Sequence, residues 1–219
     1  MKNTFFALSV LLAIFSPQGS AAHQRSQPAA VSLTVSVFND ANVPPSALSK
    51  AQDRVIAIML RAGVSLTWLD CGTPGNRQPD SGCSAIVFPK HVSVRVVPKT
   101  SPAKPRIFGQ SFQDATGEGN YAIVYFAGLA TSNTSSTVPA GELLGCVIAH
   151  ELGHLLLGKD SHSATGLMSA VWKDSELRQA AHGNLFFTAG QGDRIRSRYA
   201  AANARLEKSS EPLQPSSAK

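Results

Sequence analysis

The sequence has few charged residues and a large hydrophobic fraction. Only 16% of its 219 residues are Asp, Glu, Lys or Arg, whereas 43% are hydrophobic. This balance excludes a disordered or collagen-like polypeptide and fits one globular domain. The excess of Lys and Arg gives a formal charge of +6. That charge could attract acidic partners but identifies none.

The apolar run at the N-terminus is too short to cross a membrane. It extends from Phe5 to Phe15, follows Lys2 and precedes Ser20-Ala21-Ala22, the layout of a secretory signal peptide. Eleven helical residues span only about 16 Å of a hydrocarbon core of roughly 30 Å. We therefore expect residues 1–22 to be removed during export to the periplasm or the medium, without a stable membrane anchor. The mature chain would have 197 residues and a charge of +5.

The C-terminal segment 207–219 is rich in Ser and Pro, and we expect it to be a disordered tail. The folded domain is then expected over residues 23–206. Export also bears on the three cysteines. Cys71 and Cys83 flank a loop rich in Gly and Pro, so we expect a disulfide worth about 3 kcal/mol. Cys146 lies in an apolar helical run and is expected to be a small buried residue.

The first part of the chain has a β-α-β pattern. Apolar residues alternate from Val31 to Val37, a helix with Ser46 at its N-cap follows as far as Gly63, and a second strand covers 64–69. This order favours a parallel pair with a right-handed crossover. We expect further strands at 85–88, 91–97 and 121–126, a loop at 128–139, and helices at 140–157, 174–181 and 188–206.

The residues that carry chemistry lie in the predicted helix 140–157. His150 and His154 are four residues apart, so both imidazoles lie on one face and can point at one ion. Glu151, next to His150, can then reach a water bound to that ion. This H-E-x-x-H arrangement is that of zinc peptidases. A catalytic zinc also needs a third protein ligand and an open position. His162, Asp160 and Glu176 all follow closely enough to supply that ligand.

These residues resemble the metzincin clan of zinc peptidases, and its matrixin-like members most closely. Those proteins have H-E-x-x-H-x-x-G-x-x-H, followed by a turn that places a methionine beneath the metal. Here Gly158 looks like the glycine but comes one residue late, and His162 looks like the third ligand but comes two residues late. Asp160 holds the usual ligand position. Met168 looks like the methionine of the turn. We favour His162 as the third ligand, with Asp160 as the alternative.

The resemblance implies an α+β fold in a single domain: a twisted mixed β-sheet with an active-site helix, a Met-turn and a C-terminal helix. It implies one catalytic Zn²⁺ and a secreted endopeptidase that hydrolyses peptide bonds with a zinc-bound water activated by Glu151. The substrate would be a protein or peptide, not a nucleic acid, and would lie along an edge strand, for which the segment before Tyr121 is a possible place. Too few residues precede the first strand for a folded prodomain, so we expect a protease that emerges active or is controlled by a separate protein inhibitor.

Two other interpretations stay open at this point. The displaced glycine and third ligand could spoil the open zinc position, which would leave a catalytically silent protein that binds zinc or peptides. Alternatively, Glu176 could be the third ligand, as in thermolysin-like peptidases. In that case Met168 would have no role at the metal.

Overall fold

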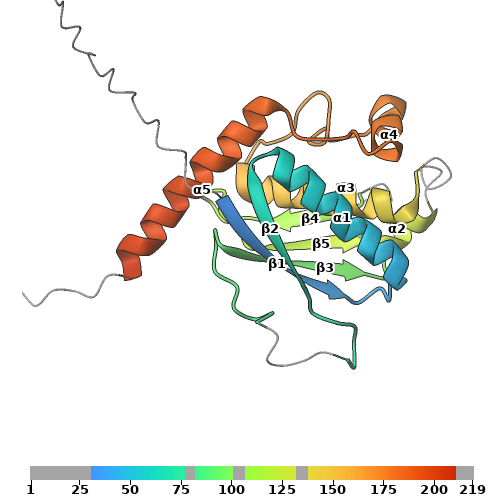
Figure 1. The fold of residues 1–219 in the computed structure, drawn as a ribbon, viewed down its shortest axis with the longest axis horizontal. Helices are drawn as coiled ribbons and strands as arrows, with labels where there is room; N and C mark the ends of the chain where they lie inside the picture. Colours follow the sequence, from blue (N-terminus) through green and yellow to red (C-terminus); the bar gives the residue numbers. More distant parts are fainter. Residues whose placement is uncertain (1–30, 77–81, 101–106, 132–137, 211–219) are drawn as a thin grey trace, which may run out of the picture.

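The computed structural model describes residues 31–76, 82–100, 107–131 and 138–210. The predicted signal peptide at 1–22 and the last nine residues of the predicted tail lie outside these ranges. The described part forms a β-sheet with helices packed on it (Figure 1).

The sheet has five strands in the order β2-β1-β3-β5-β4. Four of them are parallel to their neighbours, and β4 pairs antiparallel with β5 at one edge. The mixed sheet expected from the resemblance is therefore present. Its strands are β1 (Val31–Asn39), β2 (Val64–Asp70), β3 (His91–Val97), β4 (Gly109–Phe112) and β5 (Tyr121–Tyr125).

The predicted β-α-β opening is confirmed. β1 and β2 are parallel, with Val31 opposite Val64, and helix α1 (Pro45–Arg61) connects them. The alternating apolar residues of β1 are buried on the face that the helices cover. The helix begins at Pro45 rather than after Ser46. Proline suits this first position because its missing N–H would have no partner there.

Three local features differ from the sequence predictions. Residues 85–88 form no strand, because Phe88 is followed by Pro89, which has no N–H to pair, and the chain turns there. The short strand β4 was anticipated only as a possible edge segment before Tyr121. Helix α2 (Phe126–Thr131) begins inside the segment that we expected to be a strand, and it extends into the predicted loop.

Helices α1 and α3 (Ala140–Leu157) pack against each other and on the sheet. Glycines allow their backbones to approach closely: a Cβ on Gly145 would lie 2.8 Å from the carbonyl oxygen of Ala51. α3 is long and apolar enough to cross a membrane by composition, but most of it is buried in the domain. Its limits agree with the predicted 140–157, so the helix that carries the H-E-x-x-H residues is the central helix of the core.

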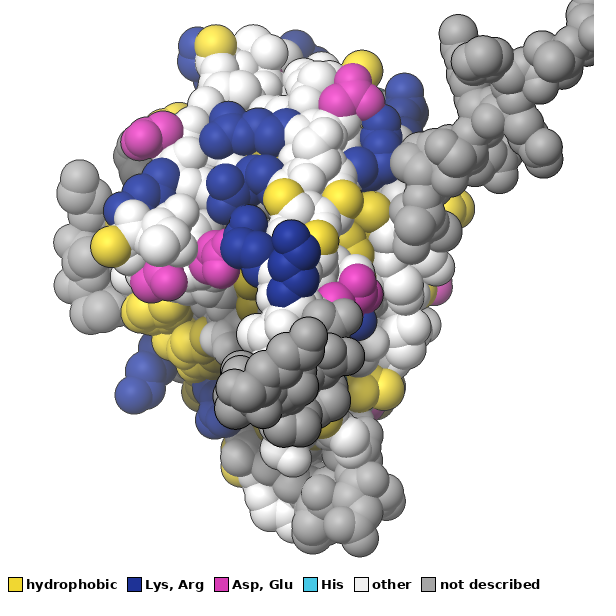
Figure 2. Space-filling view, turned by 90° about the vertical axis from the view of Figure 1, so that its left-hand side faces the viewer, with side chains coloured by type: hydrophobic (Ala, Val, Ile, Leu, Met, Phe, Trp, Pro, Cys, Tyr) yellow, Lys and Arg dark blue, Asp and Glu magenta, His cyan; other side chains and the backbone are white. Residues whose placement is uncertain are grey.

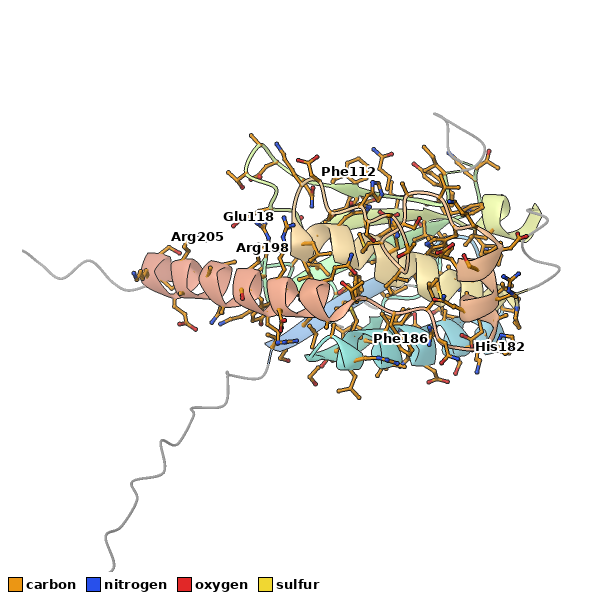
Figure 3. All side chains as sticks on the ribbon, turned by 90° about the horizontal axis from the view of Figure 1, so that it is seen from above. Phe112, Glu118, His182, Phe186, Arg198 and Arg205 are labelled. Carbon is orange, nitrogen blue, oxygen red and sulfur yellow. A yellow bond between two sulfur atoms is a disulfide. The ribbon has the colours of Figure 1, made fainter. Side chains whose placement is uncertain are left out.

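Two further helices complete the described part. α4 covers Asp174–Ala181, as predicted, and α5 covers Ala189–Ser210. α5 continues four residues beyond Leu206, where we expected the domain to end, and it extends past the body of the molecule (Figures 1 and 3). The Tyr199 hydroxyl donates a hydrogen bond to the Ser32 carbonyl, which ties α5 to the start of β1.

Lys and Arg side chains gather on the side of the molecule where α5 lies (Figure 2). Several α5 arginines are paired within the domain. Arg196 forms an ion pair with Asp193, and Arg205 reaches Glu118 in the β4–β5 turn (Figure 3). Arg198 donates to the carbonyl oxygens of Leu156 and Gly117. The positive charge on this side therefore contributes to holding α5 in place.

Cys71 and Cys83 form the expected disulfide, which closes the loop between β2 and the segment that leads to β3. Cys146 is free and fully buried in α3, also as expected.

Candidate metal centre

Three histidines converge at the C-terminal part of α3. His150 and His154 come from neighbouring turns of the helix, and His162 comes from the segment that follows it. One ring nitrogen of each lies within 4.8 Å of the others. The ring centroids of His154 and His162 are 4.6 Å apart, and those of His150 and His154 are 4.7 Å apart. This group can hold a metal ion.

The backbone at the end of α3 explains how His162 returns to the helix. Gly158 ends α3 with φ 81° and ψ −164°, a conformation that essentially only glycine adopts. Asp160, two residues later, has a φ of 54°. These two residues reverse the chain within a short segment, so that His162 lies beside the helix it has just left.

The other two candidate ligands do not join the group. Asp160 is exposed, and its carboxylate is not among the converging atoms. Glu176 is buried at the start of α4, where its carboxylate accepts hydrogen bonds from the Lys173 N–H and the Ser175 hydroxyl. Burial opposes ionisation, but these bonds hold the pKa of Glu176 below its ordinary value. Glu176 thus acts as a helix-capping residue.

Hydrogen bonds to Nδ1 of His150 and His154 orient the two rings and so fix the position of each Nε2. His150 Nδ1 lies 2.7 Å from the carbonyl oxygen of Leu167, which can only accept, so Nδ1 carries the proton and Nε2 keeps its lone pair. His154 Nδ1 lies 2.7 Å from the Ser161 hydroxyl. When that hydroxyl accepts, both Nε2 lone pairs face each other across 3.0 Å. Such an arrangement repels unless a cation lies between the two nitrogens.

The environment keeps both imidazoles neutral. Burial lowers the pKa of His150 to about 4. Burial, together with the neighbouring His150 and His162, lowers the pKa of His154 to about 3. A metal binds only the neutral form of histidine. Both residues are therefore ready to bind a metal at neutral pH without first losing a proton.

The spacing of the nitrogens suits zinc. Zn–N bonds of about 2.0–2.1 Å in a tetrahedron place ligand nitrogens about 3.4 Å apart. The observed Nε2–Nε2 separation of 3.0 Å, within a group no wider than 4.8 Å, is close to this value. Three imidazoles are also a donor set that zinc accepts, with a fourth position left for another ligand.

Glu151 lies between α3 and the edge strand β4. Its side chain is 4% exposed, and its Oε2 has no hydrogen-bond partner among the described residues. Burial raises the pKa of Glu151 to about 8, although a hydrogen bond with Ser111 on β4 opposes the rise. Gly109 on the same strand makes room for this carboxyl group, because a Cβ there would lie 2.7 Å from Glu151 Cδ.

Met168 lies beneath the helix in a closed turn. It is fully buried, and a Cβ on Gly153 would lie 2.5 Å from its sulfur atom. The turn is closed by a hydrogen bond from Ser163 N–H to the Met168 carbonyl, 2.8 Å long, and Gly166 has a φ of 80°. The apolar residue predicted for this turn thus contacts α3 on its H-E-x-x-H segment.

Several contacts to the histidines had no sequence signal. Ser161 and the Leu167 carbonyl orient two of them, but a backbone carbonyl has no signature in the sequence. The Trp172 indole N–H donates to the same Leu167 carbonyl, 3.0 Å away, and its ring lies edge-on to His150. Gln113, after β4, donates to the His154 carbonyl. Only the position of Ser161, next to His162, could have drawn attention.

Three solved structures are similar to this chain. A zinc-dependent peptidase from Methanocorpusculum labreanum aligns over 74% of this chain and 99% of its own, with 15% identity and a TM-score of 0.50. Archaemetzincin from Methanopyrus kandleri aligns over 79% of this chain and 98% of its own, with 16% identity and a TM-score of 0.49. Metalloproteinase-II from Bacteroides fragilis aligns over 80% of this chain and 55% of its own, with 13% identity and a TM-score of 0.48.

The first of these structures establishes that this chain shares the α+β fold of a zinc-dependent peptidase. No protein-family model matches the sequence. No curated protein matches it either.

Proposed function

We propose that the mature chain is a secreted zinc-dependent endopeptidase of the metzincin type, closest to its matrixin-like members. The observation that carries this proposal is the convergence of three imidazoles, two of them held neutral, beside the buried carboxyl group of Glu151. His150, His154 and His162 would hold the metal. The solved zinc-dependent peptidase with the same fold supports the assignment.

Zinc, when bound, would acidify a water molecule and polarise the carbonyl of the scissile bond. The residues of this chain do the rest. Burial favours the protonated form of Glu151 in the metal-free protein, and a cation bound beside it would lower its pKa and favour the carboxylate. In that form Glu151 would accept a proton from the attacking water and pass it to the leaving amine. Its Oε2 is available for this because no described residue bonds it. Ser111 holds the carboxyl group from the β4 side, which fixes the direction in which the group presents its free oxygen.

The edge strand β4 offers a place for an extended substrate. β4 pairs only with β5, so among the described residues the hydrogen-bonding groups on its outer side face no other strand. Phe112 on this strand is 42% exposed and stacks on Tyr121, and Val171 after the Met168 turn is 71% exposed. A peptide paired with β4 could extend in both directions, which favours cleavage within a chain over removal of its terminal residues.

The test is a peptide-library cleavage assay on protein expressed without residues 1–22, with and without zinc. Glu151→Gln should keep one zinc per chain and lose cleavage. The matched control is Glu142→Gln, the same change on the same helix at a residue that pairs with Lys50. Cleavage by the Glu151→Gln variant at the normal rate would refute the mechanism. Zinc bound in full by a wild-type protein that cleaves nothing would point to the catalytically silent alternative.

A further inference from the structure

A hollow lies near the carboxyl ends of β1 and β2, beside the start of α1. Its volume is about 480 Å³. Small-molecule sites commonly have about 300–1,000 Å³, and in sheets with parallel strands they favour the crevice outside the carboxyl ends. Three segments form the walls: the turn after β1, the start of α1, and the loop that follows β2.

This pocket is separate from the histidine group. β2 and β4 are at opposite edges of a five-stranded sheet, so they lie about 19 Å apart at about 4.8 Å per strand. The start of α1 also packs on the start of α3, where Gly141 meets the Ala47 carbonyl. His150 lies nine residues farther along α3, about 14 Å at 1.5 Å per residue. The pocket is therefore not a subsite of the candidate metal centre.

The walls combine an aromatic ring with neutral polar groups. Trp68, Leu48 and Pro45 supply apolar surface, and Asn42, Gln52 and Asn76 supply side-chain amides. Asp70 is the one charged residue in the lining, and the lining contains no Lys, Arg or His. A phosphate or carboxylate would find no cation here, so the pocket suits a neutral ligand with many hydrogen-bonding groups.

Some polar groups of this pocket are already paired and others are free. Asp70 Oδ1 accepts a hydrogen bond from the Gly72 N–H at 2.9 Å, which leaves its other oxygen for a ligand. The Asn39 side chain closes the turn after β1, because it accepts from Val43 N–H at 2.8 Å and donates to the Val43 carbonyl at 3.1 Å. In contrast, the side chains of Asn42, Gln52 and Asn76, and the indole N–H of Trp68, have no hydrogen-bond partner among the described residues. The unpaired donors and acceptors therefore surround an aromatic ring.

We propose that this pocket binds a neutral saccharide. A sugar hydroxyl both donates and accepts hydrogen bonds, and a side-chain amide offers the complementary pair. The C–H face of a sugar ring can pack on the indole of Trp68, which supplies apolar area and a polar N–H together. The single carboxylate of Asp70 adds a strong acceptor for a hydroxyl and disfavours anionic sugars.

The two tryptophans of the chain, Trp68 and Trp172, allow a direct test. In a Trp172→Phe variant, fluorescence reports on Trp68 alone. We would titrate this variant with maltose, cellobiose, lactose and di-N-acetylchitobiose, and repeat the titrations on the wild type by calorimetry. At least one disaccharide should give a saturable signal in both. Gln52→Ala and Asn76→Ala should each weaken its binding about fivefold, the effect of one lost hydrogen bond.

The matched control is Gln179→Ala, an exposed glutamine on α4 outside the pocket, which should leave the affinity unchanged. Sialyllactose and inorganic phosphate should give no saturable signal. Absence of binding by all four disaccharides would overturn the proposal. The proposal would also fail if the Gln52→Ala and Asn76→Ala variants bound the disaccharide as tightly as the wild type. Binding of the anionic probes more tightly than the neutral disaccharides would overturn it as well.

Discussion

Gly109 on β4 lies so close to Glu151 on α3 that a β-carbon at position 109 would overlap the carboxyl group, 2.7 Å from Cδ. The edge strand and the helix therefore approach closely here, and the absence of a side chain at Gly109 leaves room for the carboxyl group of Glu151. Ser111, two residues along the same face of the strand, bonds that carboxyl group. The position of the proposed general base thus depends on a strand that itself has only one neighbour.

Gly109→Ala should displace Glu151 and lower kcat/KM about 100-fold, since a misplacement of about 1 Å at a reacting group has an effect of this size. Zinc content should not change, because position 109 contacts none of the histidines in the structure. Peptide cleavage and metal analysis measure the two effects. Gly190→Ala is the control, because a Cβ there meets nothing within 4 Å. Equal activity of the two variants would contradict the assigned role of Gly109.

Gly158→Ala should weaken zinc binding by moving His162. The residue has a φ of 81°, and a Cβ there would lie 2.7 Å from Arg198 Cζ, so both the backbone and the neighbouring side chain resist the change. Competition with a chelator measures the zinc affinity. Gly75→Ala is the control: Gly75 also has a positive φ, 85°, but lies far along the chain, so its substitution should leave zinc affinity unchanged. Undiminished zinc affinity in Gly158→Ala would show that the turn does not depend on this glycine.

Ser161→Ala should lower zinc affinity about 10- to 100-fold, the usual effect of removing a group that orients a metal-binding histidine. The Ser161 hydroxyl is buried and bonds His154 Nδ1. Ser163→Ala is the matched control, because that hydroxyl bonds the Thr165 carbonyl instead of a histidine. Threonine at position 161 should restore part of the affinity. If both alanine variants bind zinc as tightly as the wild type, Ser161 does not orient His154.

The metal-free protein should lose stability as the pH rises from about 7.5 to 8.5. The folded protein keeps a proton on Glu151, with a pKa of about 8, that the unfolded chain releases above its ordinary 4.5. The free energy of unfolding therefore falls with rising pH on account of this group. His150 and His154 act in the opposite direction: the unfolded chain takes up protons below 6.5 and the folded protein does not, so stability also falls toward pH 4.

Urea unfolding with a chelator present, at pH 7.5 and pH 8.5, measures this effect. In this window the histidines of the unfolded chain, with their ordinary pKa of 6.5, are already mostly neutral, whereas Glu151 loses its proton in the folded protein. Glu151→Gln should flatten the slope, whereas Glu142→Gln should keep it. A slope that persists unchanged in Glu151→Gln would show that the buried carboxyl group is not its source.

His150, Glu151 and His154 were predictable because their grouping needs only one helix in which the two histidines are four positions apart. His162 was favoured over Asp160 only through the resemblance, because its place beside the helix depends on two positive φ angles in the turn after α3. Strand β4 was anticipated only as a possible edge segment, without bounds, for a related reason. Its four residues, Gly-Gln-Ser-Phe, have no apolar alternation, and the strand forms through pairing with β5 and contact with α3.

The predicted strand at 85–88 shows the converse error. Its residues have strand-forming side chains. However, the disulfide at Cys83 and the proline at position 89 leave too few residues between them to pair with a neighbouring strand. Local composition therefore predicted the long, regular elements, and it failed where a short segment takes its conformation from its neighbours.

The glycine that ends α3 also determines how relatives of this chain can be recognised. Three residues separate His154 from Gly158, and three separate Gly158 from His162, where the usual pattern has two and two. One residue added to the helix and one added to the turn bring the third histidine back to the same group. A search pattern with fixed gaps passes over such a chain. A pattern that allows two or three residues on each side of the glycine would find it.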